Sequence, residues 1–248
     1  MNNIKKAFEN KKAFIGFLTA GDPTFDESVK NITALADGGA DLIEVGIPFS
    51  DPIAEGAAVQ ESNIRAINNG MTVDRMFDLV EKVREKTSVP IILVSYLNPV
   101  FSYGYEEFFK NCARVGINGI ICPDLPYEEQ AEVKAPAESN GVALISVVEM
   151  SDKVRMTEIA KKSVGFVYIT SAGTDTAVVA DAVNTLHECA DIPAAVNVDM
   201  CDDETASSML DSADGIIVSK ALVELVAENK ENTPERISNF VKKMKKSI

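Results

Sequence analysis

The chain has 248 residues, of which 46% are hydrophobic and a quarter are charged, a composition that excludes a disordered or fibrous protein. Acidic side chains outnumber basic ones by 38 to 24, and the formal charge of -14 argues against nucleic acid or an anionic membrane as a partner. No apolar run approaches the roughly 18 residues of a membrane span, and the segment from Met1 to Lys12 lacks the apolar core of a signal peptide. We therefore expect a soluble, cytoplasmic protein.

The residue types that most often bind metals or attack substrates are scarce. His187 is the only histidine, which excludes a histidine metal cluster, and its helical surroundings indicate a half-exposed structural residue. The cysteines lack the C-x-x-C spacing of zinc or redox sites, and we interpret them as buried, reduced thiols: Cys112, Cys122, Cys189 and Cys201. We expect no metal site and no cofactor, so carboxylates remain the main candidates for acid–base chemistry.

Short apolar runs recur along the chain. Each has four to eight residues and is continuous rather than alternating, which is typical of parallel strands covered on both faces. Eight strands are predicted: Ala13–Thr19, Leu42–Gly46, Pro90–Tyr96, Gly119–Cys122, Ala143–Val148, Gly165–Ile169, Pro193–Val196 and Gly215–Val218.

Amphipathic segments, such as Glu27–Ala36, separate these strands and predict helices that cover them. Glycines before several strands mark the helix ends, for example Gly39 and Gly116. Eight such units without a linker predict a single α/β domain over residues 1–248, a (β/α)8 TIM barrel. Two additions are expected: a helix over Asn2–Glu9 and a long loop, Ile47–Gln60, after the second strand.

Two carboxylates come together at the second predicted strand. Glu44 lies between Ile43 and Val45, so alternation directs it into the barrel when its neighbours face the helices. A buried carboxyl has a raised pKa unless partners hold its charge, so Glu44 is either a structural residue satisfied by hydrogen bonds or a proton donor and acceptor. Glu55 follows on the next loop, at the barrel face where such enzymes place their chemistry. The pair predicts two-carboxylate proton transfer.

Several motifs in this region resemble one known family. The segments Phe17-Leu-Thr-Ala-Gly-Asp-Pro23, Ile43-Glu-Val-Gly-Ile-Pro-Phe-Ser-Asp-Pro-Ile-Ala-Glu-Gly56 and Gln60-Glu-Ser-Asn-Ile-Arg-Ala66 strongly resemble the tryptophan synthase α chain. Two later pieces fit in order, Tyr96-Leu-Asn-Pro99 and Pro123-Asp-Leu-Pro126. The resemblance covers essentially the whole chain.

The resemblance implies a lyase of tryptophan biosynthesis that cleaves indole-3-glycerol phosphate, by a retro-aldol reaction, to indole and glyceraldehyde 3-phosphate. It implies an α2β2 assembly in which indole passes to a pyridoxal-phosphate β subunit. Glu44 matches the glutamate that protonates indole C3, and Glu55 falls where most members carry an aspartate that accepts the indole N–H. Phe17, Tyr96 and Tyr168 match positions of the substrate pocket.

Three loops that hold the substrate phosphate in the family differ here. The family patterns after strands six, seven and eight are Gly-Val-Thr-Gly, Gly-Phe-Gly and Gly-Ser. The segments at these places are Gly173-Thr-Asp-Thr176, Asn197-Val-Asp199 and Ser219-Lys220. Glycines let backbone amides approach a phosphate, and side chains at the same positions occupy that space.

Two of these changes add negative charge. Asp199 would repel a phosphate by about 4 kcal/mol at about 4 Å and an effective dielectric of about 20, and Asp175 would repel Glu55 if its loop closed. Lys220 offers compensation, because it can pair with Asp199. We therefore predict retained carboxylates and an altered phosphate site.

Three other functions remain open at this point. The chain could be a catalytically impaired partner that regulates a β subunit through the loop after strand two and Asn98–Pro99. It could be a lyase for a non-phosphorylated indole derivative. Lys220 as a Schiff-base nucleophile is a weaker hypothesis, since nothing else in the sequence singles it out.

Overall fold

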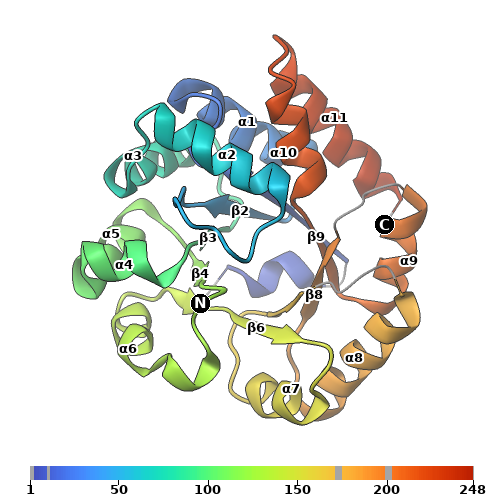
Figure 1. Ribbon diagram of the computed structural model, residues 1–248. Coiled ribbons are helices and arrows are strands. Elements are labelled where there is room, and N and C mark those ends of the chain that lie inside the picture. The colour runs from blue at the N-terminus through green and yellow to red at the C-terminus, as the bar shows by residue number, and fades with distance from the viewer. Residues whose placement is uncertain (1–2, 10–11, 171–174, 199–202, 248) are drawn as a thin grey trace.

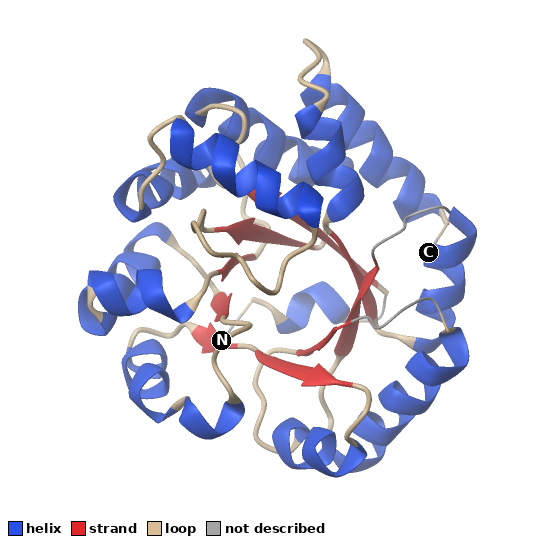
Figure 2. Ribbon diagram, in the orientation of Figure 1, coloured by secondary structure: helices blue, strands red, loops and turns tan. Residues whose placement is uncertain are grey.

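The parallel strands form a barrel that is surrounded by helices (Figures 1 and 2). The computed structural model describes residues 3–9, 12–170, 175–198 and 203–247. Its strands are β1 (Ala13–Thr19), β2 (Leu42–Gly46), β3 (Ile91–Val94), β4 (Gly119–Ile121), β5 (Ala143–Leu144), β6 (Ser146–Glu149), β7 (Val167–Thr170), β8 (Ala194–Val198) and β9 (Gly215–Val218).

The order of the strands in the sheet is β5-β4-β3-β2-β1-β9-β8-β7-β6, and every pair is parallel. The predicted fifth strand is divided, since β5 pairs with β4 whereas β6 pairs with β7. Ile145 joins the two halves and donates its N–H to the carbonyl of Ile120. The eight-unit α/β barrel is confirmed, with a seam at Ile145 where the chain passes from one neighbouring strand to the other.

The helices form the outer ring of Figure 1. They are α1 (Phe25–Gly38), α2 (Ala57–Asn68), α3 (Val73–Arg84), α4 (Leu97–Tyr103), α5 (Tyr105–Val115), α6 (Ala131–Ser139), α7 (Lys153–Ala160), α8 (Thr176–Cys189), α9 (Asp203–Ser212), α10 (Lys220–Ala227) and α11 (Thr233–Lys246), with short 3-10 turns η1 (Lys5–Phe8) and η2 (Tyr127–Glu129). As predicted, Gly39 and Gly116 end their helices in the left-handed conformation. None of the helices in the described segments is both long and apolar enough to cross a bilayer.

Several predicted strand bounds shift by one or two residues, and two segments predicted outside the strands also differ from the structure. In place of the helix expected over Asn2–Glu9, a single 3-10 turn, η1, is present, because the segment packs through Ile4 and Ala7 rather than along a full helical face. The loop expected to run to Gln60 ends earlier, since α2 already begins at Ala57 with Gly56 as its N-cap.

The core has two layers. The larger lies between the strands and the helices, and the smaller fills the barrel with residues from the strands and from η1. Ile4 is fully buried in this inner layer, next to Gly119 of β4 and Gly165 before β7. A Cβ on Gly165 would lie 2.9 Å from Ile145 Cδ1 and 3.3 Å from Ile4 Cγ2. Ile4 therefore closes the barrel floor beside the seam.

Candidate active site

A cavity of about 640 Å³ opens at the carboxyl ends of the strands. This is the face at which (β/α)8 enzymes place their chemistry. Four of the residues expected to bind substrate line it, together with the loop carboxylate Glu55: Tyr168, Asn197, Ser219 and Lys220. An apolar wall that the sequence did not reveal completes it: Val59, Val94, Ile121, Pro123 and Val147.

Glu44 points into the barrel, as the alternation of β2 predicts. Its neighbours Ile43 and Val45 belong to the outer layer against the helices. Its register partners are Phe17 on β1 and Ile92 on β3. Glu44 is 1% exposed, and its Oε1 has no hydrogen-bond partner among the described residues. A structural glutamate would have its oxygens satisfied, so the geometry favours a carboxyl kept for proton transfer.

The surroundings of Glu44 favour its neutral form. Burial raises the pKa of Glu44 to about 8, and the negative charge of Glu55 contributes to the rise. Burial also raises the pKa of Glu55, which is only partly covered. Glu44 is therefore mostly protonated at neutral pH. The charge on Glu55 therefore adds to the effect of burial in keeping Glu44 protonated.

Phe17 lies beside Glu44 rather than in the cavity lining. It is buried in a small cluster with Val59 and Val223. The ring occupies space left free by Gly46, where a Cβ would lie 2.7 Å from Phe17 Cζ. A glycine at the end of β2 therefore makes room for this ring beside the strand that carries Glu44.

The loop that carries Glu55 is held by Tyr96. The backbone N–H of Ala54 donates to the Tyr96 hydroxyl at 2.7 Å, and the rings of Phe49 and Tyr96 stack with centroids 5.3 Å apart. Burial raises the pKa of Tyr96 to about 12; the Ala54 hydrogen bond opposes the rise, whereas Glu55 adds to it. Gln60 Nε2 donates to the carbonyl of Glu55 at 2.7 Å. Tyr96 thus positions the loop and does not line the cavity itself.

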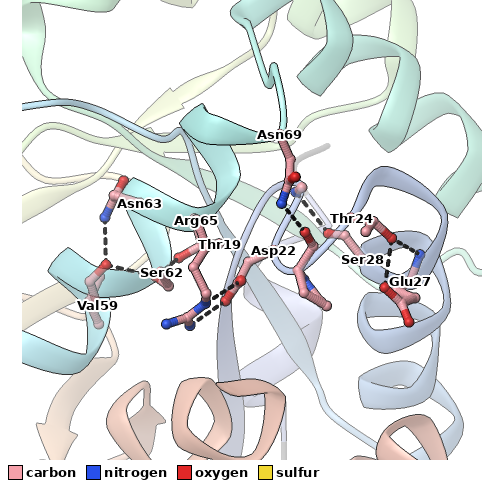
Figure 3. A network of polar contacts seen from close by, with 12 residues as sticks. Thr19, Asp22, Thr24, Glu27, Ser28, Val59, Ser62, Asn63, Arg65 and Asn69 are labelled. Carbon is pink, nitrogen blue, oxygen red and sulfur yellow. Dashed lines mark hydrogen bonds and ion pairs between the residues drawn. The ribbon is translucent and has the colours of Figure 1, made fainter. Parts of the chain in front are cut away.

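A polar network ties α2 to the loop after β1, and Figure 3 shows it from close by. Arg65 donates to both carboxylate oxygens of Asp22, each at 2.8 Å, and Asp22 is almost completely buried. Burial raises the pKa of Asp22, and Arg65 partly lowers it again; the Asp22 hydrogen bond in turn raises the pKa of Arg65. The bidentate geometry is that of an ion pair. The motif containing these residues was recognised from sequence, but the pairing was not.

The same network reaches the loop of Glu55 through α2. Thr19 and Ser62 share a hydrogen bond of 2.6 Å, and Asn63 Nδ2 donates to the carbonyl of Val59. Asn63 Oδ1 accepts the backbone N–H of Phe49, the residue that stacks on Tyr96. Side chains of α2 therefore fix the start of the loop, and Tyr96 fixes its end.

The opposite side of the cavity carries the residues of the altered phosphate site. Ser219 caps α10 without a side-chain hydrogen bond to the helix, and Lys220 begins this helix. The N-terminus of a helix attracts anions through its free N–H groups and its dipole, and a lysine adds a positive charge. On β8, Asn197 Oδ1 is buried and has no hydrogen-bond partner within the described part of the chain.

Other predicted residues lie elsewhere. Asp175 is exposed and accepts the N–H of Ala177, so it caps α8 and does not line the cavity. Gly173 and Asp199 lie outside the described residues, and so does the proposed pairing of Asp199 with Lys220.

His187 and the three described cysteines do not line the cavity. His187 is exposed on α8 and hydrogen-bonds Asp214 at 2.8 Å, as expected for a structural residue. Cys112 and Cys122 are free and buried, and Cys189 is only half-buried, so the expectation of burial was wrong there. Cys201 lies outside the described residues.

Comparisons with known proteins agree with the geometry. The family model described as tryptophan synthase alpha chain matches residues 3–248. The tryptophan synthase alpha chain of Lacticaseibacillus casei is 38% identical over 255 residues, covering 100% of this chain and 96% of that protein. The corresponding protein of Thermoanaerobacter sp. (strain X514) is 36% identical over 262 residues, with 100% of both chains covered.

Solved structures match over the same length. The tryptophan synthase subunit alpha from Legionella pneumophila str. Paris has a TM-score of 0.93 at 30% identity, covering 100% of this chain and 98% of that one. A chain of M. tuberculosis tryptophan synthase, in the open form with BRD0059 bound, has a TM-score of 0.92 at 28% identity, covering 100% and 99%. With a family model over almost every residue and relatives that align end to end, the chain belongs to the tryptophan synthase alpha chain family.

Proposed function

We propose that this chain is the lyase of tryptophan biosynthesis that cleaves indole-3-glycerol phosphate to indole and glyceraldehyde 3-phosphate, with Glu44 and Glu55 as its catalytic residues. The observation that carries the assignment is Glu44 itself. It is a carboxyl buried in the barrel, with an oxygen that no described residue satisfies and with a pKa raised to about 8. Such a group can both give and take a proton near neutral pH.

The proton transfers balance around this one carboxyl group. Neutral Glu44 gives its proton to C3 of the indole ring, which leaves the ring positively charged at nitrogen. The carboxylate then takes the proton of the hydroxyl on the adjacent glycerol carbon. As the C–C bond breaks, its electrons return to the ring, and a carbonyl forms on the departing three-carbon fragment. Glu44 ends the cycle protonated.

Glu55 stabilises the positive charge that the ring nitrogen acquires. As a carboxylate on the loop above β2, it accepts the ring N–H and stabilises the positive charge that develops there. Tyr96 and α2 keep this loop in place through the contacts described above. The apolar wall around Val94 and Ile121 suits the flat ring.

The phosphate of the substrate belongs at the N-terminus of α10. Ser219 and Lys220 line the cavity there, and the helix dipole and the lysine charge both favour an anion. Asp175 caps α8 and does not line the cavity, so it does not oppose a substrate in that position. These features support a phosphorylated substrate over a neutral indole derivative, and they favour a lyase over an impaired partner.

We further propose that the chain assembles with a tryptophan synthase β subunit, which receives the indole. Two large apolar side chains stand exposed on segments that follow β2 and β3: Ile53 on the loop of Glu55 and Phe101 on α4. A cytoplasmic location fits an enzyme of amino-acid biosynthesis. Residues 1–248 are proposed to form one domain, a proposal supported by the single sheet that joins all nine described strands.

The test is the release of indole from indole-3-glycerol phosphate, with and without a β subunit. Wild-type turnover that falls about 10²- to 10⁴-fold in Glu44→Gln, the range for loss of a general acid–base group, would support the assignment. The matched control is Glu106→Gln, at an exposed position on α5, which should keep wild-type turnover. Absence of wild-type turnover under both conditions would exclude the lyase.

A further inference from the structure

The carboxamide oxygen of Asn197 is a buried polar atom beside the cavity that has no role in the proposed reaction. Asn197 is the fourth residue of β8 and pairs in register with Ile217 of β9. Its neighbours Val196 and Val198 belong to the outer layer, whereas Ala195 belongs to the layer inside the barrel. Alternation therefore turns Asn197 inward, and it lines the cavity.

The carboxamide oxygen of Asn197 is buried and has no hydrogen-bond partner among the described residues. A buried acceptor without a hydrogen bond costs free energy, and most buried side-chain polar atoms in proteins have a hydrogen-bond partner. Asn197 itself lines the cavity, together with a lysine and carboxylates, so its buried oxygen lies next to a polar site rather than in the apolar core. These features indicate that a ligand supplies the missing donor.

The chemistry of the substrate narrows the choice of donor. The phosphate carries acceptor oxygens when ionised, so it does not satisfy an acceptor. The ring N–H is taken by Glu55, and the hydroxyl next to the breaking bond passes its proton to Glu44. The three-carbon chain carries one more hydroxyl, on its middle carbon. We propose that Asn197 is a specificity-determining residue that accepts a hydrogen bond from this hydroxyl, an inference that rests on the proposed function.

The predicted consequence is discrimination between two three-carbon phosphates that differ only in the hydroxyl on the middle carbon. Glycerol 3-phosphate and 3-hydroxypropyl phosphate both carry a terminal hydroxyl and can both place a phosphate at α10, but only glycerol 3-phosphate carries the middle hydroxyl. The wild-type protein should bind glycerol 3-phosphate about 3- to 10-fold more tightly, the range for one buried hydrogen bond. Asn197→Leu keeps a similar side-chain size without polar atoms, and it should remove this preference.

The experiment is calorimetric titration of both ligands into the wild type, Asn197→Leu and Asn197→Gly. The glycine variant carries the residue that the family pattern has at this position, and it keeps the test open if leucine prevents folding. Asn184→Leu, at an exposed position on α8, is the matched control and should bind both ligands like the wild type.

Two results would overturn the inference. One is a wild-type protein that binds both ligands equally. The other is a loss of affinity in Asn197→Leu and Asn197→Gly that is as large for 3-hydroxypropyl phosphate as for glycerol 3-phosphate, which would place the amide against the phosphate. Failure of the proposed function is detected separately, as absence of indole release by the wild type, because these titrations need no turnover.

Discussion

The hydroxyl of Tyr96 accepts a 2.7 Å hydrogen bond from the backbone N–H of Ala54, the residue that precedes Glu55. Tyr96 follows β3 and Ala54 follows β2, so the bond joins two neighbouring loops at the mouth of the barrel. The tyrosine ring also stacks on Phe49 at the start of the same loop. One side chain thus fixes the loop at two points, and the position of Glu55 depends on it.

Replacing Tyr96 by phenylalanine tests this dependence. The ring and its stacking on Phe49 remain, but the N–H of Ala54 loses its acceptor, which costs about 1 kcal/mol. We expect kcat/KM for indole-3-glycerol phosphate to fall about tenfold, since a small displacement of a catalytic group is enough for such a loss. Steady-state kinetics measures the effect. Tyr105→Phe on α5 is the control, and equal kinetics for the two variants would contradict a positioning role.

The raised pKa of Glu44 predicts a pH dependence of stability. A carboxyl with a folded-state pKa of about 8 and an ordinary value of 4.5 binds its proton more tightly when folded. Its contribution to the free energy of unfolding is therefore full below about pH 4.5 and is lost as pH rises to about 8. The loss is at most on the order of 5 kcal/mol.

Denaturant unfolding of Glu44→Gln between pH 5 and 9 isolates this contribution. Glutamine stays neutral, so the variant should gain stability relative to the wild type as pH rises, and the gain should level off above about pH 8. The exposed control Glu106→Gln should differ from the wild type by a constant amount. A constant difference for Glu44→Gln as well would show that the carboxyl is not held neutral.

Glu55 should influence both the ring and the pKa of Glu44. Its charge raises that pKa, so Glu55→Gln should shift the alkaline limb of the kcat–pH profile to lower pH as well as slow turnover. Glu55→Asp keeps the charge and shortens the side chain by one methylene, so we expect a smaller loss and little shift. The shift is measured from profiles of kcat against pH for the wild type, Glu55→Gln and Glu55→Asp. An unshifted limb in Glu55→Gln would show that the two carboxyl groups are not coupled.

The ion pair between Asp22 and Arg65 should contribute strongly to the stability of the fold around the site. Removing one partner leaves the other residue without an opposite charge beside it, and Asp22 is buried. Arg65→Met should therefore lower the free energy of unfolding by about 2–4 kcal/mol. This is less than for a fully buried pair, because Arg65 is partly exposed. The variants Asp22→Asn, Arg65→Met and their combination form a double-mutant cycle, measured by denaturant unfolding. A coupling energy near zero would contradict a cooperative pair.

Local pattern was enough to predict the parts of the site that lie on strands. The alternation around Glu44 placed its side chain inside the barrel, and the apolar runs placed β1, β2 and β9 with their observed bounds. The run Ala143–Val148, in contrast, reads as one strand. Its division at Ile145 follows from pairing with two different neighbours, and closure of the barrel decides that.

Contacts between loops were not predictable in the same way. Asp22 and Arg65 are 43 positions apart, as are Thr19 and Ser62, and only the packing of α2 against the loop after β1 brings them together. Asn197 was predicted to fill a phosphate site, because a side chain replaces a glycine there. The structure shows an unsatisfied acceptor at the cavity, which an amino-acid sequence does not encode locally.

Ile4 has a consequence for the order in which the chain can fold. It is buried beside Gly165, 161 positions later in the sequence, and beside Ile145 at the seam. Contacts between residues so far apart form only after the intervening chain has been made and arranged. During synthesis, the segment around Ile4 must therefore wait until the ribosome has produced more than half of the barrel. The segment around Ile4, which closes the floor of the barrel, is thus synthesised early but can pack only late.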